Sequence, residues 1–355
     1  MDKVQQDQPF EFNSCTTVFE NLLKKEKGPE TTMMFEYKKK HPCLVDNDQL
    51  PLIDLSSFTG VGSSTILEKE RCKRQIIEAS KGWGFFQVVN HGISNELLKK
   101  LNAEQMKLFR QPYDKKSSSN SFLSNTYRSG TPTPRNQFSW SEAFHIPLSD
   151  IRSGNPQNPN NNNNTLRSTI DEFAGTLSEL ALKIAQVLAE NVGSDSKGLA
   201  GYFAENCSEE TCYLRLNRYP PCPISSGQVF GLMPHTDSDF LTILYQDQVG
   251  GLQLLKDGRW VTVKPNPQYL IINIGDLFQA WSNDLYKSVE HRVMTNNKFE
   301  RFSAAYFLCP SHDTVIRSKG GPPLYKRFSF GEFREQVQED VRKLGRKVGL
   351  SRFLL

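Results

Sequence analysis

Hydrophobic and polar positions repeat along the chain with two different periods, which predict helices in some segments and strands in others. Apolar residues every three to four positions predict amphipathic helices over residues 65–80, 94–112, 166–188 and 330–345. Short apolar runs between turn residues predict strands at 51–55, 85–90, 212–219, 241–245, 252–255, 260–263, 270–274, 288–293 and 303–308. Many short strands at this spacing are typical of a sandwich or jelly roll. We therefore expect an α+β fold with a jelly-roll core that is braced by helices.

Changes in composition divide the chain into four parts. Residues 1–48 are polar and rich in lysine, which favours a flexible N-terminal arm. Residues 49–205 form a mixed, mainly helical N-terminal region, and its asparagine-rich stretch at 154–164 predicts a surface loop. The strand-rich part places the jelly-roll core at 206–315, and a charged amphipathic pattern predicts a C-terminal helical segment at 316–355.

Composition and charge narrow the class of protein. The 355 residues carry a net charge of only +4, and no Lys/Arg block is interleaved with aromatic residues, so we expect no nucleic-acid partner. The seven cysteines are scattered without a Cys-x-x-Cys pair, which favours a reducing compartment over a disulfide framework. The first residues lack an apolar leader, and no apolar run is long enough to cross a bilayer. We expect a cytoplasmic protein with no membrane partner, and take a monomer as the default state.

The stretch from Gly231 to Tyr245 carries the sharpest chemical signal. It places His235 and Asp237 two residues apart, so that in a strand their side chains would share one face. A second histidine, His291, follows Ser-Val-Glu further along the chain. Two imidazoles and one carboxylate are the ligand set of non-haem Fe(II) oxygenases, which leave the opposite positions of the metal open. The three residues are therefore candidate catalytic residues and metal ligands.

Arg301 and Ser303 repeat the two-residue spacing ten positions after His291. On a neighbouring strand they would point together and offer a guanidinium fork and a hydroxyl group to a carboxylate. This pair suits the distal carboxylate of 2-oxoglutarate, so Arg301 is a candidate in both the catalytic and the cosubstrate site.

A lone His-x-Asp motif is common, and a hydrogen-bonded core or surface histidine would explain His235 or His291 taken singly. The ordered set of His-x-Asp, a distant His and then Arg-x-Ser is much harder to obtain by chance. A third histidine, His91, stands directly before Gly92 at a predicted strand end, so we expect it to stabilise the turn rather than to bind metal.

With Asn217-Arg-Tyr-Pro-Pro-Cys222 preceding the three motifs, the chain resembles plant 2-oxoglutarate and Fe(II)-dependent dioxygenases from about Leu52 to Phe333. Residues 82–92, Gly-Trp-Gly-Phe-Phe-Gln-Val-Val-Asn-His-Gly, are similar to the signature of that family's N-terminal region. The resemblance implies a double-stranded β-helix with Fe(II) on the histidines and Asp237, O2 as the oxidant and 2-oxoglutarate as cosubstrate. It also implies contacts of Tyr219 and Asn217 with 2-oxoglutarate, and ascorbate as a reductant.

Within that family, residues 237–254 and 273–284 resemble gibberellin 2-oxidases, particularly the branch that acts on C20 gibberellins. The implied reaction is 2β-hydroxylation of a gibberellin, which inactivates the hormone or its precursor. Such an apolar diterpenoid with carboxylates needs an apolar pocket with a few polar anchors. The candidates for the pocket wall are Tyr127, Trp140, Phe240 and Trp281.

Two positions depart from the pattern of the family. Arg218 stands where many relatives have a second tyrosine, and Ser129 where close relatives often carry tryptophan, so both bear on the substrate mouth.

Three other functions also fit the residues. The same iron chemistry could act on another gibberellin position or on another specialised metabolite such as a flavonoid. A catalytically silent binding protein on the same barrel is the alternative from another class.

Overall fold

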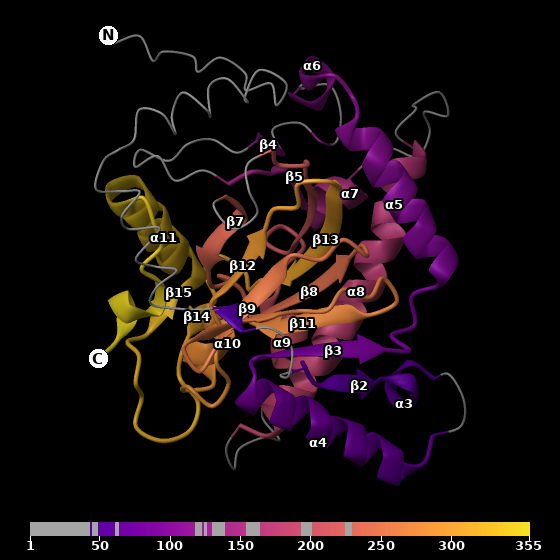
Figure 1. Cartoon of the computed structure of the whole chain (residues 1–355). Helices are drawn as coiled ribbons and strands as arrows, with labels where there is room; N and C mark the ends of the chain where they lie inside the picture. The colour runs from indigo at the N-terminus through magenta and orange to yellow at the C-terminus, as the bar shows by residue number, and fades with distance from the viewer. Residues whose placement is uncertain are drawn as a thin grey trace.

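Two facing β-sheets form the centre of the molecule in the computed structural model (Figure 1). The structure describes residues 43–44, 49–60, 64–117, 123, 126–129, 139–153, 164–192, 201–223 and 229–355. The expected N-terminal arm, apart from 43–44, and the asparagine-rich loop up to residue 163 lie outside the described residues. Among the described helices, none has the length and apolar character needed to span a bilayer.

The larger sheet has eight strands in the order β2-β3-β11-β8-β13-β6-β5-β4. Their bounds are β2 Leu52–Asp54, β3 Phe85–Val89, β4 Tyr127–Ser129, β5 Glu142–Pro147, β6 Tyr213–Tyr219, β8 Leu241–Gln246, β11 Leu270–Ile274 and β13 Arg301–Leu308. Strands from both sides of the expected boundary at residue 205 therefore share one sheet.

The smaller sheet has five strands in the order β1-β10-β9-β12-β7. Its strands are β1 Cys43–Leu44, β7 Phe230–His235, β9 Leu252–Lys256, β10 Arg259–Thr262 and β12 His291–Met294. The turn between β9 and β10 contains Asp257 and Gly258 at φ 48° and 75°, as a two-residue hairpin requires. A separate pair, β14 Val315–Ile316 and β15 Phe328–Ser329, lies near the C-terminus.

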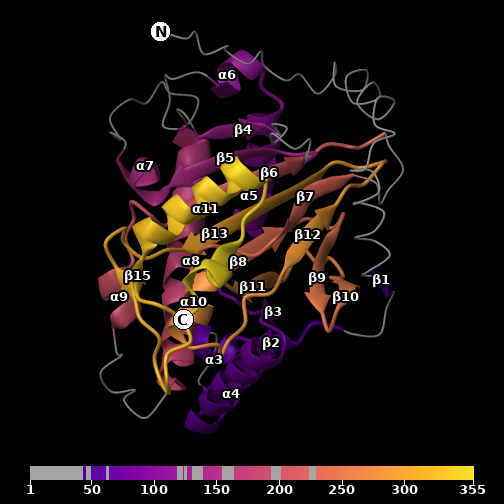
Figure 2. The same ribbon diagram turned by 90° about the vertical axis from the view of Figure 1, so that its left-hand side faces the viewer.

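Helices pack around the two sheets, and α5 and α8 cover the larger sheet on the side away from the smaller one. Their bounds are α3 Ser56–Thr59, α4 Ile66–Gly82, α5 Asn95–Phe109, α6 Tyr113–Ser117, α7 Leu148–Arg152, α8 Asn164–Glu190, α9 Tyr202–Asn206, α10 Asp276–Trp281, α11 Phe330–Leu344 and the 3-10 helix η2 Gly349–Phe353. α5 and α8 lie on one flank of the barrel and α11 on the opposite flank (Figure 1), so that α11 is at the front in the turned view of Figure 2. The expected jelly-roll core braced by helices is confirmed.

The apolar interior divides into two cores. The main core lies between the larger sheet and the helices, and includes Phe86, Phe144, Phe173 and Ile243. A smaller core between the two sheets includes Phe85, Leu254, Ile271 and Val293. Because strand residues alternate between the two sides, each central strand of the larger sheet contributes to the helix-facing core with one set and to the barrel interior with the other.

Helix α11 begins with a capping box. The Ser329 hydroxyl accepts from the Glu332 backbone N–H at 3.1 Å, and the Glu332 carboxylate accepts from the Ser329 backbone N–H at 2.6 Å. These bonds satisfy donors that the first turn of a helix otherwise leaves open.

We expect Ser329→Ala to lower the free energy of unfolding by about 1 kcal/mol, because it removes the cap acceptor. Urea unfolding of wild type, Ser329→Ala and Ser329→Asn measures the effect, and the asparagine variant should retain most of the stability because it keeps an acceptor. An alanine variant as stable as the wild type would contradict this role of the cap.

Candidate active site

The two histidines of the candidate metal site come from neighbouring strands of the smaller sheet. His235 is the last residue of β7, and His291, the first residue of β12, is its direct register partner. Their ring centroids lie 4.3 Å apart. The antiparallel pairing of β7 with β12 thus brings together two side chains that are far apart in the sequence.

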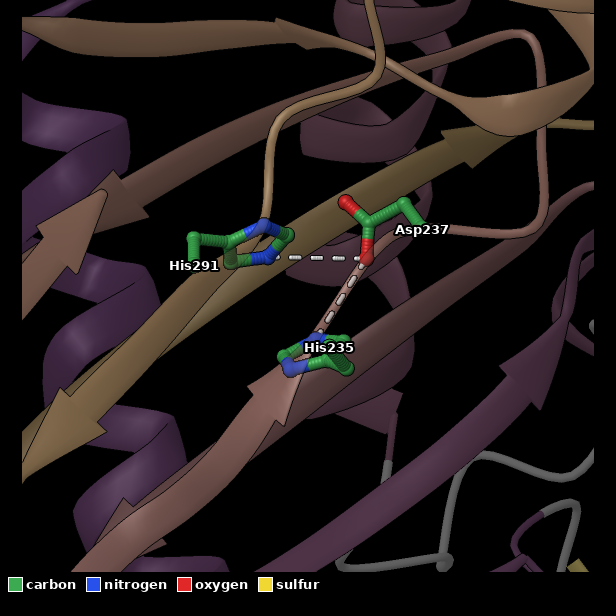
Figure 3. Close-up of side chains that lie close together, drawn as sticks. All are labelled: His235, Asp237 and His291. Atoms are coloured by element: carbon green, nitrogen blue, oxygen red, sulfur yellow. Dashed lines mark ion pairs between the residues drawn. The ribbon is translucent and has the colours of Figure 1, made fainter. Parts of the chain in front are cut away.

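Asp237 completes the cluster from the loop that follows β7. Its Oδ1 atom lies 3.5 Å from Nε2 of His235 and 3.6 Å from Nε2 of His291, as Figure 3 shows. One ligand atom from each residue lies within 4.8 Å of the other two, the only such group among the described residues. The expectation that His235 and Asp237 share a strand face is corrected, because β7 ends at His235 and the loop turns Asp237 towards the histidines.

The outer atoms of all three side chains are held by hydrogen bonds. Nδ1 of His235 pairs with the Met233 carbonyl at 2.7 Å, and Nδ1 of His291 with the Val289 carbonyl at 3.1 Å. Each carbonyl fixes the ring with Nδ1–H outward, so both Nε2 atoms present lone pairs to the centre of the cluster.

The second oxygen of Asp237 is also occupied. Oδ2 accepts from the Thr242 hydroxyl at 2.6 Å and from the Asn273 amide at 2.8 Å, which leaves Oδ1 to face the histidines. The roles of Thr242 and Asn273 as donors to Asp237 were not predicted from the sequence. An asparagine within the apolar run of β11 is a signal that could have identified Asn273.

The protonation states suit a divalent cation. Burial lowers the pKa of His291 to about 4, so its ring is neutral at neutral pH. Burial acting alone would raise the pKa of Asp237, but its interactions with the His291 and His235 imidazoles and the hydrogen bond from Thr242 bring it below its ordinary value. Neutral imidazoles and an ionised carboxylate are the forms that bind a metal.

The candidate anion clamp, Arg301 and Ser303, lies on the face of the larger sheet that is turned towards the barrel interior. Arg301 pairs in register with Tyr219, and Ser303 with Asn217, across β13 and β6. The Arg301 guanidinium lies 4.8 Å from the Tyr219 ring centroid, and Asn217 Nδ2 donates to the Ser303 hydroxyl at 3.4 Å. A side chain on Gly231 would come within 2.7 Å of Tyr219, so a residue without Cβ is needed for β7 to pass this ring.

Arg301 has donors left over for a ligand. It is 2% exposed, and its Nη2 atom donates to Gln246 at 2.8 Å. Its Nε and Nη1 atoms have no partner among the described residues, although both are buried. Buried unpaired donors of a guanidinium are costly, so this side chain fits a buried anionic acceptor such as a carboxylate.

Three of the four candidate pocket walls pack elsewhere. Phe240 and Trp281 are fully buried in the main core against Phe203 and Phe278, on the helix side of the larger sheet. Tyr127 packs on Phe144, on that same side. We correct these three assignments to core packing, because Phe240 and Trp281 lie within the main core and Tyr127 faces the same side of the sheet as its register partner Phe144.

Trp140 remains a candidate wall residue. It is 3% exposed and donates from Nε1 to the Pro220 carbonyl at 3.0 Å, next to the end of β6. Arg218 and Ser129 share the helix-facing side with Glu142, their register partner on β5. Arg218 forms ion pairs with Glu142 and Glu300, so its guanidinium points away from the face that holds Tyr219.

A cationic region of the barrel interior was not predicted from the sequence. His145 on β5 stacks on Tyr213 at a centroid distance of 3.8 Å, and Arg215 is its register partner on β6. Burial, together with the charges of Arg215, Arg334 and Arg128, lowers the pKa of His145 to about 3. This part of the barrel interior therefore carries positive charge beside aromatic rings, which suits an apolar molecule with a carboxylate.

Comparisons with known proteins agree with this geometry. Residues 210–310 match the 2OG-Fe(II) oxygenase superfamily, and residues 50–166 match the N-terminal region described as non-haem dioxygenase in morphine synthesis. The chain is 58% identical to gibberellin 2-beta-dioxygenase 8 of Arabidopsis thaliana over 88% of this chain and 89% of the relative. It is 48% identical to gibberellin 2-beta-dioxygenase 6 of Oryza sativa subsp. japonica over 86% and 84%.

The chain is also similar in structure to a solved protein. The crystal structure of JOX2 in complex with 2OG, Fe and JA superposes with a TM-score of 0.71 at 32% identity, and covers 89% of this chain and 91% of that protein.

Proposed function

This chain belongs to the 2OG-Fe(II) oxygenase superfamily, and we propose that it hydroxylates gibberellins at the 2β position, with C20 forms as the substrates. In this proposal His235, Asp237 and His291 hold the iron. The observation that carries it is the convergence of three ligand atoms whose outer partners leave only the inner atoms free to bind. The relatives named gibberellin 2-beta-dioxygenases support the choice of substrate.

The iron and its cosubstrate would supply the oxidising chemistry, using O2 and releasing succinate and CO2. The protein contributes position and environment. The Met233 and Val289 carbonyls hold both imidazoles in one tautomer, and Thr242 and Asn273 hold the Asp237 carboxylate. Preorganised ligands of this kind keep one face of the metal site free for reactants.

We propose that Arg301 and Ser303 bind the distal carboxylate of 2-oxoglutarate, with Tyr219 and Asn217 beside it. The unpaired donors of Arg301 support this role, because a carboxylate at the guanidinium would accept hydrogen bonds that the protein leaves unmade in a buried place. Orientation of the cosubstrate along β13 would direct its other end towards the three metal ligands.

The cationic region around His145 supports an acidic substrate. Gibberellins are apolar diterpenoids with carboxylates, and the interior offers the rings of Tyr213 and Phe307 together with arginines. We propose that Arg334, which reaches this region from α11, attracts a substrate carboxylate, and that Trp140 forms part of the apolar wall.

We expect Arg334→Met to raise the KM for a gibberellin about ten-fold, the cost of one charge-assisted contact, while the KM for 2-oxoglutarate stays unchanged. Steady-state kinetics with each substrate varied in turn measures both constants. Arg342→Met is the matched control, because Arg342 lies on an exposed part of the same helix. An unchanged gibberellin KM in Arg334→Met would remove this residue from substrate binding.

The proposed reaction is tested by anaerobic purification with Fe(II), followed by incubation with 2-oxoglutarate, ascorbate, O2 and a mixed gibberellin pool. Mass spectrometry should find 2β-hydroxylated gibberellins together with an equal amount of succinate. Products oxidised at another position, or turnover only with flavonoids, would identify the alternative substrates. A protein that binds gibberellin without forming succinate would be a silent binding protein.

We also propose that the protein acts as a cytoplasmic monomer. The scattered cysteines support a reducing compartment, since Cys72, Cys207, Cys212, Cys222 and Cys309 are free thiols. Light scattering coupled to gel filtration tests the oligomeric state, and a dimer mass would contradict the monomer.

A further inference from the structure

A partly buried lysine from the C-terminal segment contacts the loop that carries Asp237. Lys347 follows α11, and its Nζ atom lies 2.9 Å from the Thr236 carbonyl and 2.7 Å from the Ser238 hydroxyl. It also forms an ion pair of 2.7 Å with Asp276 Oδ2. An ammonium group has three donors and no acceptor, so these three oxygens match its full hydrogen-bonding capacity.

The loop needs such support because it is not part of either sheet. We call residues 236–239 the metal-binding turn. β7 ends at His235 and β8 begins only at Leu241, so the carbonyls between them have no ladder partner. Lys347 bonds to the carbonyl and the hydroxyl on the two sides of Asp237, and buried backbone groups rarely lack such partners.

Asp276 holds the same turn from the other side. Its backbone N–H donates to the Asp237 carbonyl at 3.0 Å, and its carboxylate accepts from the Thr236 hydroxyl at 3.2 Å. The Leu277 N–H donates to the Asp239 carbonyl at 3.0 Å. The ion pair between Asp276 and Lys347 therefore links the hydrogen bonds that each residue makes to the turn into one network.

Contacts of the C-terminal segment fix the position of Lys347. Helix α11 ends at Gly345 in the left-handed region, and η2 packs beside α10. Arg352 of η2 donates to the buried Asp340 of α11 at 2.9 Å, which fixes the segment on both sides of Lys347. The side chain of Lys347 is 13% exposed and that of Asp276 is 3% exposed, so the pair is shielded from solvent.

We propose that Lys347 is a positioning residue for the iron site, which acts by holding the metal-binding turn so that Asp237 meets the two histidines. It does not touch the metal, because an ammonium has no lone pair to donate. This inference rests on the proposed assignment of the metal ligands. Changes to outer partners of metal ligands commonly weaken metal binding by about 10- to 100-fold.

The test is a titration of the metal-free full-length protein with Co(II), followed through its visible absorption, without 2-oxoglutarate or gibberellin. We expect Lys347→Met to raise the Kd for Co(II) at least about 10-fold and to change the shape of the cobalt bands. Lys343→Met is the matched control, because Lys343 is an exposed lysine of α11 in a surface ion pair with Glu339. It should bind Co(II) as the wild type does.

A second variant separates positioning from stability. Lys347→Met leaves the Asp276 carboxylate buried without its cation, which lowers the melting temperature and can prevent folding. The double variant Lys347→Met/Asp276→Asn removes both charges, and we expect it to fold and still to bind Co(II) at least about 10-fold more weakly. Wild-type Co(II) affinity in a folded variant without Lys347, even with a lowered melting temperature, would overturn the proposal.

His235→Ala distinguishes this result from a failure of the metal site itself. It should abolish the cobalt bands, which assigns the signal to the cluster. If His235→Ala retains the wild-type bands, the ligand assignment is wrong, and the proposal for Lys347 is overturned with it.

Discussion

Asp237→Ala is expected to abolish the turnover of 2-oxoglutarate, with a loss of at least about a thousand-fold in rate, equivalent to about 4 kcal/mol. The carboxylate is the only anionic group of the cluster, and its Oδ1 atom lies within 3.6 Å of Nε2 of both histidines. Without it two imidazoles remain, which hold a ferrous ion too weakly to keep it in the site. Release of succinate, measured with Fe(II) and a gibberellin present, gives the rate.

The matched control for this variant is Asp313→Ala, since Asp313 is an exposed carboxylate in the loop after β13. It should turn over at the wild-type rate. The melting temperature of metal-free Asp237→Ala shows whether the fold is intact, because Thr242 and Asn273 lose their shared acceptor. Succinate release at the wild-type rate from a folded Asp237→Ala would rule out this residue as a ligand.

Arg301→Ala is expected to raise the KM for 2-oxoglutarate about 30- to 150-fold, while the KM for gibberellin changes little. A bidentate contact between a guanidinium and a carboxylate is worth about 2–3 kcal/mol, and 1.4 kcal/mol corresponds to a factor of ten. Arg301→Lys should recover only part of the loss, because an ammonium keeps the charge but lacks the planar fork.

Arg259→Ala serves as the control for Arg301, because Arg259 is exposed on β10. Varying 2-oxoglutarate at saturating Fe(II) and gibberellin gives the constants. An Arg301→Ala enzyme with the wild-type requirement for 2-oxoglutarate would show that the distal carboxylate binds elsewhere.

Much of the fold could be predicted because strand and helix periods are local properties of the sequence. The helix at Asn95–Phe109 and the strand at Leu270–Ile274 follow directly from their apolar spacing. The short helix α10 was not predicted, because six residues after a strand give too little periodicity to recognise. His91 accepts from the Ile93 N–H at 3.2 Å, as expected of a residue that stabilises a turn.

The candidate metal ligands could be predicted because their residue types and order are chemically distinctive. The pairing of His235 with His291 depends on which strands become neighbours, and this information is not local. Phe240 and Trp281 were misplaced for a related reason. An aromatic residue near a site motif packs in the core or lines a pocket according to the direction of its strand or helix face, which is fixed only when the sheets assemble.

Lys347 shows the limit most clearly. A lysine after a charged amphipathic helix is normally a solvated residue, and nothing in its sequence neighbourhood marks it as partly buried. Its three oxygen partners come from segments that lie far earlier in the chain, with Thr236 111 residues away. Contacts at such separation become visible only in the folded structure.

The location of iron in crystals grown anaerobically with Fe(II) and 2-oxoglutarate tests the central claim most directly. Anomalous diffraction collected above and below the iron absorption edge should show one iron peak, bonded to Nε2 of His235, Nε2 of His291 and Oδ1 of Asp237. Iron bound at another place in the protein, with these three side chains free of metal, would contradict the account.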